Sequence, residues 1–267
     1  MTGALSGKRV VNTRALDQAA ELDALLIAAG AIPLSYPCIE ICPVADAQPL
    51  DDAIIALIDG HFDWLFITSA NTVRAIATRL AALDIHLPAS PPFRTAVVGP
   101  GTCEQLHAKL GLNADVVPET YRAAELAAAV PIKTGDRVLI PQSAIAPPDL
   151  ANALSARGAT VTTVTAYRTI TGRGGVNLSG LLANGEVDAI VFASSSAVDG
   201  CAARLHSEGG RIDLLRPILT VCIGPGTART AAKHGLPDSV IPVEHTLGGV
   251  LDALQSVLSV SREESRS

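Results

Sequence analysis

The strongest constraint on the fold is that this sequence contains one pattern twice. The segment Asp63-Trp-Leu-Phe-Ile-Thr-Ser69 matches Asp188-Ala-Ile-Val-Phe-Ala-Ser194 at an offset of 125 residues. Farther along, Ala96-Val-Val-Gly-Pro-Gly-Thr102 matches Val221-Cys-Ile-Gly-Pro-Gly-Thr227 at the same offset. After the first pair, apolar residues follow at helical spacing. The chain is therefore expected to hold two copies of one structural unit.

An earlier pair of segments completes the repeat. Arg9-Val-Val and Arg137-Val-Leu match at an offset of 128, and each precedes an apolar helical pattern that ends at Gly30 or Gly158. We expect strands near residues 8–12, 63–68, 95–98, 136–140, 188–192 and 219–223, alternating with helices. This alternation predicts an α/β protein whose parallel sheets carry helices on both faces, as a duplicated flavodoxin-like or Rossmann-like unit. Such sheets bind ligands beyond the carboxyl ends of their strands.

Composition excludes several classes of function. The net charge of −6 argues against nucleic-acid binding, which requires a basic face. The five cysteines are an odd number without a C-x-x-C pair, so we expect buried reduced thiols in place of disulfides or a zinc site. No apolar stretch is long enough to span a bilayer and no signal peptide is evident, which predicts a cytoplasmic protein without a membrane partner.

Four strand-to-helix turns carry hydroxyl groups or glycines: Thr68-Ser-Ala-Asn71, Gly99-Pro-Gly-Thr102, Ser194-Ser-Ser196 and Gly224-Pro-Gly-Thr227. Free backbone N–H groups at a helix start form an anion site without a charged side chain. For any single turn, ordinary N-capping is the better explanation, and Thr102 with Gln105 has the spacing of a capping box. Four turns at matched positions favour a shared anion-binding cleft. Neither Gly-Pro-Gly-Thr turn continues into a dinucleotide fingerprint, and no P-loop is present.

Tyr167 follows an extended β-branched run and is one of three tyrosines. Half-buried packing in a strand and proton donation to a leaving hydroxyl are both compatible with this position. The residues alone do not decide between them.

The order of these elements resembles the uroporphyrinogen-III synthase family from Lys8 to about Leu258. The matching motifs are Asn12-Thr-Arg14, Gly30 to Pro37, Asp63 to Ser69, Val98 to Thr102, Val117 to Tyr121 with Glu125, Gly158 to Val161, Tyr167 to Thr169, Phe192 to Ser196, and Ile223 to Thr227. The resemblance implies two α/β domains, 1–34 plus 172–267 and 43–163, joined by antiparallel linker strands 35–42 and 164–171. The repeat alone would divide the chain near Thr134.

The resemblance also implies an activity. Members of the family convert hydroxymethylbilane, a linear tetrapyrrole with eight carboxylates, by loss of its terminal hydroxyl, a spiro intermediate, and closure with ring D inverted. It implies no cofactor or metal, and we expect a monomer. Tyr167 would assist departure of the hydroxyl. The residues implied to bind substrate are Arg14, Thr68, Ser69, Asn71, Gly101, Thr102, Ser194, Ser195, Ser196, Gly226 and Thr227.

Two other functions remain open. Gln142 and Ala193 stand where the family often has arginine and threonine, which suits a non-catalytic bilobed module that binds or senses a ligand. The retained Tyr167 and the two Gly-Pro-Gly-Thr turns favour the enzyme. An enzyme acting on a phosphorylated or nucleotide substrate is disfavoured, because the phosphate-binding motifs are missing.

Overall fold

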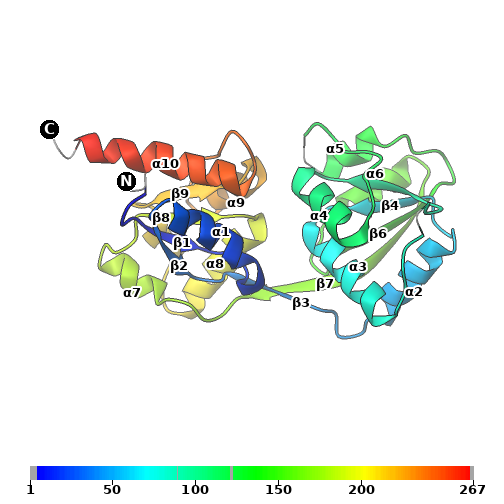
Figure 1. Cartoon of the computed structure of the whole chain (residues 1–267), viewed down its shortest axis with the longest axis horizontal. Helices are drawn as coiled ribbons and strands as arrows, with labels where there is room; N and C mark the ends of the chain where they lie inside the picture. Colours follow the sequence, from blue (N-terminus) through cyan, green and yellow to red (C-terminus); the bar gives the residue numbers. More distant parts are fainter. Residues whose placement is uncertain (1–4, 89, 121–122, 265–267) are drawn as a thin grey trace. The chain divides into compact units, whose positions relative to one another are not determined.

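The computed structural model describes residues 5–88, 90–120 and 123–264, and the chain divides into two compact units. Unit 1 comprises Met1–Glu40 and Ile170–Ser267, and unit 2 comprises the intervening Ile41–Thr169 (Figure 1). Both are mixed α/β structures with parallel strands, as the alternating pattern predicts. No helix in the described part of the chain is long and apolar enough to cross a membrane.

Unit 1 is built on a four-stranded sheet in the order β2-β1-β8-β9, and each neighbouring pair is parallel. Successive strand residues face opposite sides, so Val11 and Ile190 pack under α8 while Val10 and Val191 pack under α1 and α10. The unit therefore has helices on both faces. Its elements are β1 (Arg9–Asn12), α1 (Leu16–Ala28), β2 (Ile32–Ser35), α7 (Leu178–Ala183), β8 (Ala189–Phe192), α8 (Ser195–Ser207), the 3₁₀ helix η1 (Ile212–Leu215), β9 (Leu219–Cys222), α9 (Pro225–Lys233) and α10 (Leu247–Glu264).

Unit 2 has a five-stranded sheet in the order β3-β7-β6-β4-β5, in which β7, β6, β4 and β5 are parallel. Leu65 and Ile67 face the helices α2 and α3, whereas Trp64 and Phe66 face α5 and α6. Its elements are α2 (Gln48–Ile58), β4 (Trp64–Ile67), α3 (Ala70–Ala82), β5 (Arg94–Val97), α4 (Pro100–Leu110), α5 (Ala123–Ala129), β6 (Arg137–Ser143) and α6 (Asp149–Ala156), together with β3 (Ile39–Cys42) and β7 (Thr160–Thr171), which both cross the boundary with unit 1.

The two copies of the sequence repeat exchange strands between the units. The six strands expected from the sequence are β1, β4, β5, β6, β8 and β9, and the repeat matches β1 with β6, β4 with β8 and β5 with β9. Unit 1 combines β1 of the first copy with β8 and β9 of the second. Unit 2 combines β4 and β5 of the first copy with β6 of the second. A division near Thr134 would therefore cut through the sheet of unit 2.

All five cysteines are free thiols, but not all are buried. Cys38, Cys201 and Cys222 are buried as expected, and burial raises the pKa of the Cys222 thiol to about 11. Cys42 and Cys103 are only half-buried, which corrects the expectation of five buried thiols. Cys42 ends β3, and Cys103 lies in the first turn of α4, so neither belongs to a central strand.

Arg204 on α8 fixes the two points where the chain leaves and re-enters unit 1. Its guanidinium, which is almost fully buried, donates to the carbonyl oxygen of Pro37 at 2.7 Å and to that of Gly174 at 2.6 Å. The same group lies 3.8 Å from the ring centroid of Tyr36 and donates to Glu208 at 2.8 Å. The Tyr36 hydroxyl donates to the other oxygen of Glu208, also at 2.8 Å. One side chain thus joins both crossing segments to one helix.

The crossing segments also approach the rest of unit 1 too closely for side chains. A Cβ atom on Gly200 of α8 would lie 2.2 Å from the carbonyl oxygen of Cys38. A Cβ on Gly175, whose φ is +77°, would lie 2.0 Å from the carbonyl oxygen of Ser35. Glycine at both positions therefore allows the exit and return of the chain to pack against the unit.

Replacing Arg204 with methionine should destabilise unit 1 severely. The change leaves two buried carbonyl groups without their donor and the Glu208 carboxylate with only the Tyr36 hydroxyl, and the expected loss in free energy of unfolding is about 3 kcal/mol. Urea unfolding monitored by circular dichroism measures it. Arg211→Met, which removes an exposed guanidinium paired with Asp213, is the matched control and should leave the midpoint unchanged. Equal midpoints for the two variants would contradict this role of Arg204.

Candidate functional site

The carboxyl ends of the parallel strands in unit 2 bring several predicted residues to one edge of the sheet. Thr68 and Ser69 follow β4, and Ser69 caps α3 by accepting a hydrogen bond from the Asn71 N–H at 3.1 Å. The Asn71 side-chain oxygen in turn accepts from Arg74 at 2.9 Å. N-capping is therefore the correct interpretation of Ser69. The hydroxyl that caps α3 also faces strands β6 and β7.

Tyr167 on β7 completes this group. It lies opposite Ser143 in the β6–β7 ladder, and its hydroxyl donates to Ser69 Oγ at 3.3 Å. Only 8% of the residue is exposed. Burial raises the pKa of the phenol above its usual value, against smaller lowering effects from hydrogen bonds with Ser69, Ser143 and Asn71. The phenol is consequently protonated at neutral pH and lies within a cluster of uncharged polar groups.

Unit 1 presents a corresponding edge at the ends of β8 and β9. Ser194 caps α8 by accepting from the Ala197 N–H at 3.2 Å, and its Oγ lies 3.0 Å from Ser196 Oγ. Ser195 is the first residue of the helix. Capping is again correct for the first serine, as the matched repeat predicts, while the next two hydroxyls lie in the first turn of α8.

Arg14 follows β1 at the same edge of unit 1. Its backbone N–H donates to the Asn12 side chain at 3.1 Å, and its guanidinium lies 3.5 Å from Glu21. Only 14% of its side chain is exposed. The strand thus places a cation near the edge, held largely within the protein.

The two Gly-Pro-Gly-Thr turns have the same backbone arrangement. Gly99 and Gly224 are the N-caps of α4 and α9, neither helix has a side-chain cap, and each has proline in its first turn. The capping-box interpretation of Thr102 is wrong, because the helix begins two residues before it and Thr102 lies inside the first turn. Thr102 and Thr227 are 9% and 6% exposed, so both residues are largely covered by the protein, and the Thr102 N–H donates to the carbonyl oxygen of Gly99 at 3.1 Å.

The second glycine of each turn lies beside open space. A Cβ atom added to Gly101 would meet nothing within 4 Å, and one added to Gly226 would meet only Arg229 Nη2, at 3.8 Å. Neither glycine has a positive φ. Their missing side chains therefore leave room next to helix N-termini, where N–H groups point outward and favour anions.

Two polar residues of these edges escaped the sequence analysis. Ser143 interacts with Tyr167, but the expected strand ended at residue 140, whereas β6 continues to Ser143. Arg229 was not among the expected site residues, although it follows Gly226 by three positions in α9, a spacing that places it beside that glycine. Tyr121, part of one matching motif, lies outside the described residues. The described residues contain no cluster of three or more metal-binding side chains.

Comparison with known proteins gives a consistent result. A family model described as uroporphyrinogen-III synthase HemD matches residues 20–252. The chain is 34% identical to a uroporphyrinogen-III synthase of Synechococcus elongatus over 258 residues, covering 94% of this chain and 96% of that one. It is 28% identical to a chloroplastic uroporphyrinogen-III synthase of Oryza sativa, over 93% and 80% of the two chains.

Solved structures resemble the fold as well. A uroporphyrinogen III synthase of Thermus thermophilus aligns with a TM-score of 0.68 at 24% identity, covering 96% of this chain and 100% of that one. The likeness at this identity concerns the mixed α/β fold and its parallel sheets.

The buried phenol should titrate late. We expect the difference between the ultraviolet titrations of the wild type and Tyr167→Phe to have a midpoint above pH 10, because burial raises the pKa of Tyr167 above 10.0. A midpoint at or below pH 10 would show that water reaches the hydroxyl and would contradict this environment.

Proposed function

The chain belongs to the uroporphyrinogen-III synthase family, and from that premise we propose how its two strand edges carry out the reaction. It is a cyclising lyase of tetrapyrrole and haem biosynthesis. We take its substrate to be hydroxymethylbilane, whose terminal hydroxyl is lost while ring D is inverted. The 34% identity to a named synthase, over almost the whole of both chains, is the observation that carries this conclusion.

Binding of the substrate depends on backbone N–H groups. Hydroxymethylbilane carries eight carboxylates, and the starts of α3, α4, α8 and α9 offer N–H donors at the positive ends of their helix dipoles. The open space beside Gly101 and Gly226 supports close approach of a carboxylate to the backbone. The polar side chains that line these helix starts are those of Thr68, Ser69, Asn71, Thr102, Ser194, Ser195, Ser196 and Thr227. Arg14 and Arg229 add positive charge in unit 1.

Tyr167 is the proposed catalytic residue. Its protonated phenol donates a hydrogen bond to the terminal hydroxyl of the substrate, and the proton moves to that oxygen as the C–O bond breaks and water leaves. The cation that remains is stabilised by the pyrrole nitrogen, so the protein need not supply a charged group beside it. The ring that closes loses a proton, which restores the phenol. Hydrogen bonds from Ser69, Ser143 and Asn71 stabilise the transient phenolate.

The arrangement of the units extends the same proposal. We interpret each as flavodoxin-like, since the order β2-β1-β8-β9 in unit 1 is continued by a parallel bridge between Val221 and Val240. In unit 2, β7-β6-β4-β5 is continued by a bridge between Ala96 and Val116. We propose domains 1–34 plus 172–267 and 43–163, with antiparallel linkers 35–42 and 164–171, in a monomer that needs no cofactor.

A coupled assay tests the activity. A porphobilinogen deaminase generates hydroxymethylbilane in the presence of this protein, and the oxidised porphyrin isomers are separated by chromatography. Predominance of the type III isomer establishes ring inversion. If only the spontaneous type I isomer forms while circular dichroism shows a folded protein, the chain is a ligand-binding or sensing module that keeps the fold.

Replacing Tyr167 with phenylalanine should reduce kcat by roughly 10²-fold with little change in KM or thermal stability, because only the proton donor is lost. The coupled assay under initial-rate conditions measures this. Ser143→Ala, which removes a neighbour of the phenol and keeps the phenol itself, is the comparison and should have a smaller effect. An unchanged kcat in Tyr167→Phe would mean that the phenol has a packing role.

Adding a methyl group at Gly101 or Gly226 should weaken substrate binding without harming the fold. Both positions have room for a Cβ atom and ordinary backbone angles, so Gly101→Ala and Gly226→Ala should melt at or slightly above the wild-type temperature. We expect KM to rise about tenfold, because the methyl group blocks the path of a carboxylate to the N–H groups. Gly111→Ala, at the αL C-cap of α4, should show the reverse: lower stability and unchanged KM.

A further inference from the structure

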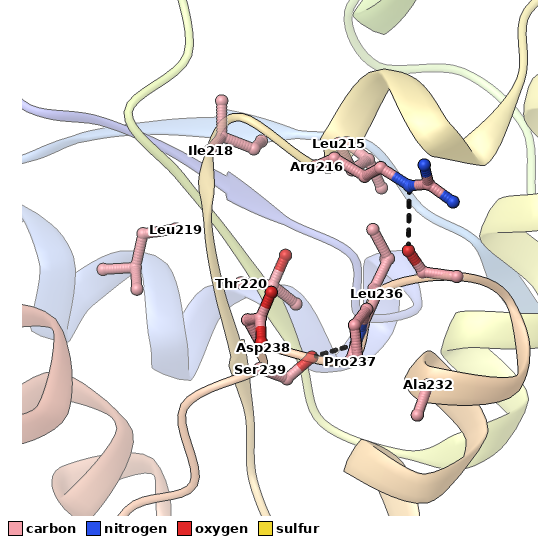
Figure 2. Close-up of a pocket in the computed structure, with 11 residues that line it drawn as sticks. Leu215, Arg216, Ile218, Leu219, Thr220, Ala232, Leu236, Pro237, Asp238 and Ser239 are labelled. Carbon is pink, nitrogen blue, oxygen red and sulfur yellow. Dashed lines mark hydrogen bonds between the residues drawn. The ribbon is translucent and has the colours of Figure 1, made fainter.

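Unit 1 contains a hollow that none of the proposed site residues line. Its volume is about 490 Å³, and it is bounded by the segment from η1 to β9, the first residues of β9, and the end of α9 with the loop that follows (Figure 2). Strand β9 begins in this hollow and ends at the Gly224 turn. The hollow therefore lies at the opposite end of β9 from the proposed substrate-binding edge of unit 1. Its volume is within the range of small-molecule sites, about 300–1,000 Å³.

The hollow has an apolar wall. Leu215 and Leu236 are buried, and Ile218 and Leu219 are half-buried and leave part of their surface facing it. Figure 2 shows these side chains around the hollow together with four polar ones, Arg216, Thr220, Asp238 and Ser239. The Ser239 hydroxyl donates to the carbonyl oxygen of Leu236 at 3.0 Å, which leaves the other three for a ligand. Apolar side chains with a few polar groups are typical of sites that orient a small ligand.

Thr220 presents its hydroxyl to the hollow. The residue is 5% exposed, and its hydroxyl has no hydrogen-bond partner among the residues that the structure describes. The oxygen atom is not among the fully buried unpartnered atoms of the described residues, so it is reached from the hollow. It can therefore form a hydrogen bond with a ligand there.

Arg216 is held in place by one nitrogen and offers the others. Its Nε donates to the carbonyl oxygen of Gly235 at 3.1 Å, while its two terminal nitrogens have no partner in the described part of the chain. Gly235 has a φ of +87°, and a Cβ there would lie 3.0 Å from Arg216 Nη2. The absence of a side chain at Gly235 thus leaves room for the Arg216 guanidinium, which is oriented before any ligand binds.

Asp238 provides the opposite charge on the same hollow. Asp238 and Arg216 are both exposed and line one hollow, and neither forms an ion pair among the described residues. Two unpaired charges of opposite sign beside one apolar wall match a molecule that carries both charges on an apolar body.

We propose that this hollow binds a small zwitterionic molecule with an apolar body. Its carboxylate pairs with the terminal nitrogens of Arg216, its ammonium group with Asp238 and the Thr220 hydroxyl, and its apolar part lies on Leu215, Leu219 and Leu236. Such a ligand joins the start of β9 to the end of α9, whose other end carries the Gly226 turn. Binding therefore stabilises unit 1 and restrains α9, a helix whose start belongs to the proposed substrate-binding edge of unit 1.

The probe is 4-(aminomethyl)benzoate, which has a carboxylate and an ammonium group at opposite ends of an apolar ring. Calorimetry with the full chain gives its dissociation constant, and amide chemical shifts identify the residues affected. 4-Methylbenzoate and 4-methylbenzylamine, each with one charged group, are the comparison ligands. We expect the probe to bind about tenfold more tightly than either and to shift the amides of Leu219, Thr220 and Leu236.

Variants assign each charge. Arg216→Gln should weaken the probe about tenfold and leave 4-methylbenzylamine unchanged, whereas Asp238→Asn should weaken the probe equally and leave 4-methylbenzoate unchanged. Thr220→Val, similar in shape, should also weaken the probe. Arg211→Gln removes a nearby cation that does not line the hollow and should change nothing.

Three results would overturn the proposal: no saturable binding of the probe, equal affinity for the probe and its single-charged analogues, or shifts confined to other parts of the chain. Thermal unfolding of each variant verifies that the fold is intact. The coupled synthase assay tests the proposed function separately, because none of these substitutions is at a residue proposed to bind the substrate or to act in catalysis.

Discussion

The buried guanidinium of Arg204 is the interaction on which the two-unit organisation depends. It binds the carbonyl groups of Pro37 and Gly174, so the chain leaves and re-enters unit 1 against the same turn of α8. The whole of unit 2 lies in the sequence between these two points. A cation buried this deeply is tolerated because its nitrogens are hydrogen-bonded to two carbonyl groups and one carboxylate, and its face packs on an aromatic ring. The same residue would be costly in a core without these acceptors.

Exchange of strands between the repeat copies explains why the two edges are alike. Each unit needs a first strand in the middle of its sheet, and each obtains it from the other copy: β1 lies beside β8, and β6 lies beside β4. Equivalent turns, at Ser69 and Ser194 and at Gly99 and Gly224, consequently end equivalent strands in both units. The units also differ at these edges. Among the described residues, only unit 2 has a buried tyrosine against its capping serine, and only unit 1 has an arginine beside its second turn glycine.

Local features of the chain could be predicted, whereas long-range pairing could not. The six repeated strands and both serine caps were evident because apolar runs and helix-start residues act within a few positions of one another. The exchange of β1 and β6 leaves no local signal, since either pairing buries the same Val and Ile side chains; the family resemblance supplied the division. Ser143 was not predicted to lie in a strand, because the proline and the glutamine at positions 141 and 142 interrupt the apolar pattern of β6. The hollow beside β9 was unpredictable for a similar reason: Arg216, Thr220 and Asp238 are unremarkable until the end of α9 returns to the start of the strand.

The central place of β1 in its sheet has a consequence for how the protein is made. The ribosome delivers β1 first, yet its partner β8 emerges only after the chain from Asn12 to Ala189 has been synthesised, on the order of ten to thirty seconds later. Unit 2 is continuous in sequence and is complete before then, so it can fold while β1 still lacks its partner β8. During this interval the Val-Val pair of β1 and the Leu side chains of α1 have only β2 to cover them. Vectorial synthesis therefore leaves these apolar side chains without their main partner strand until β8 has been made.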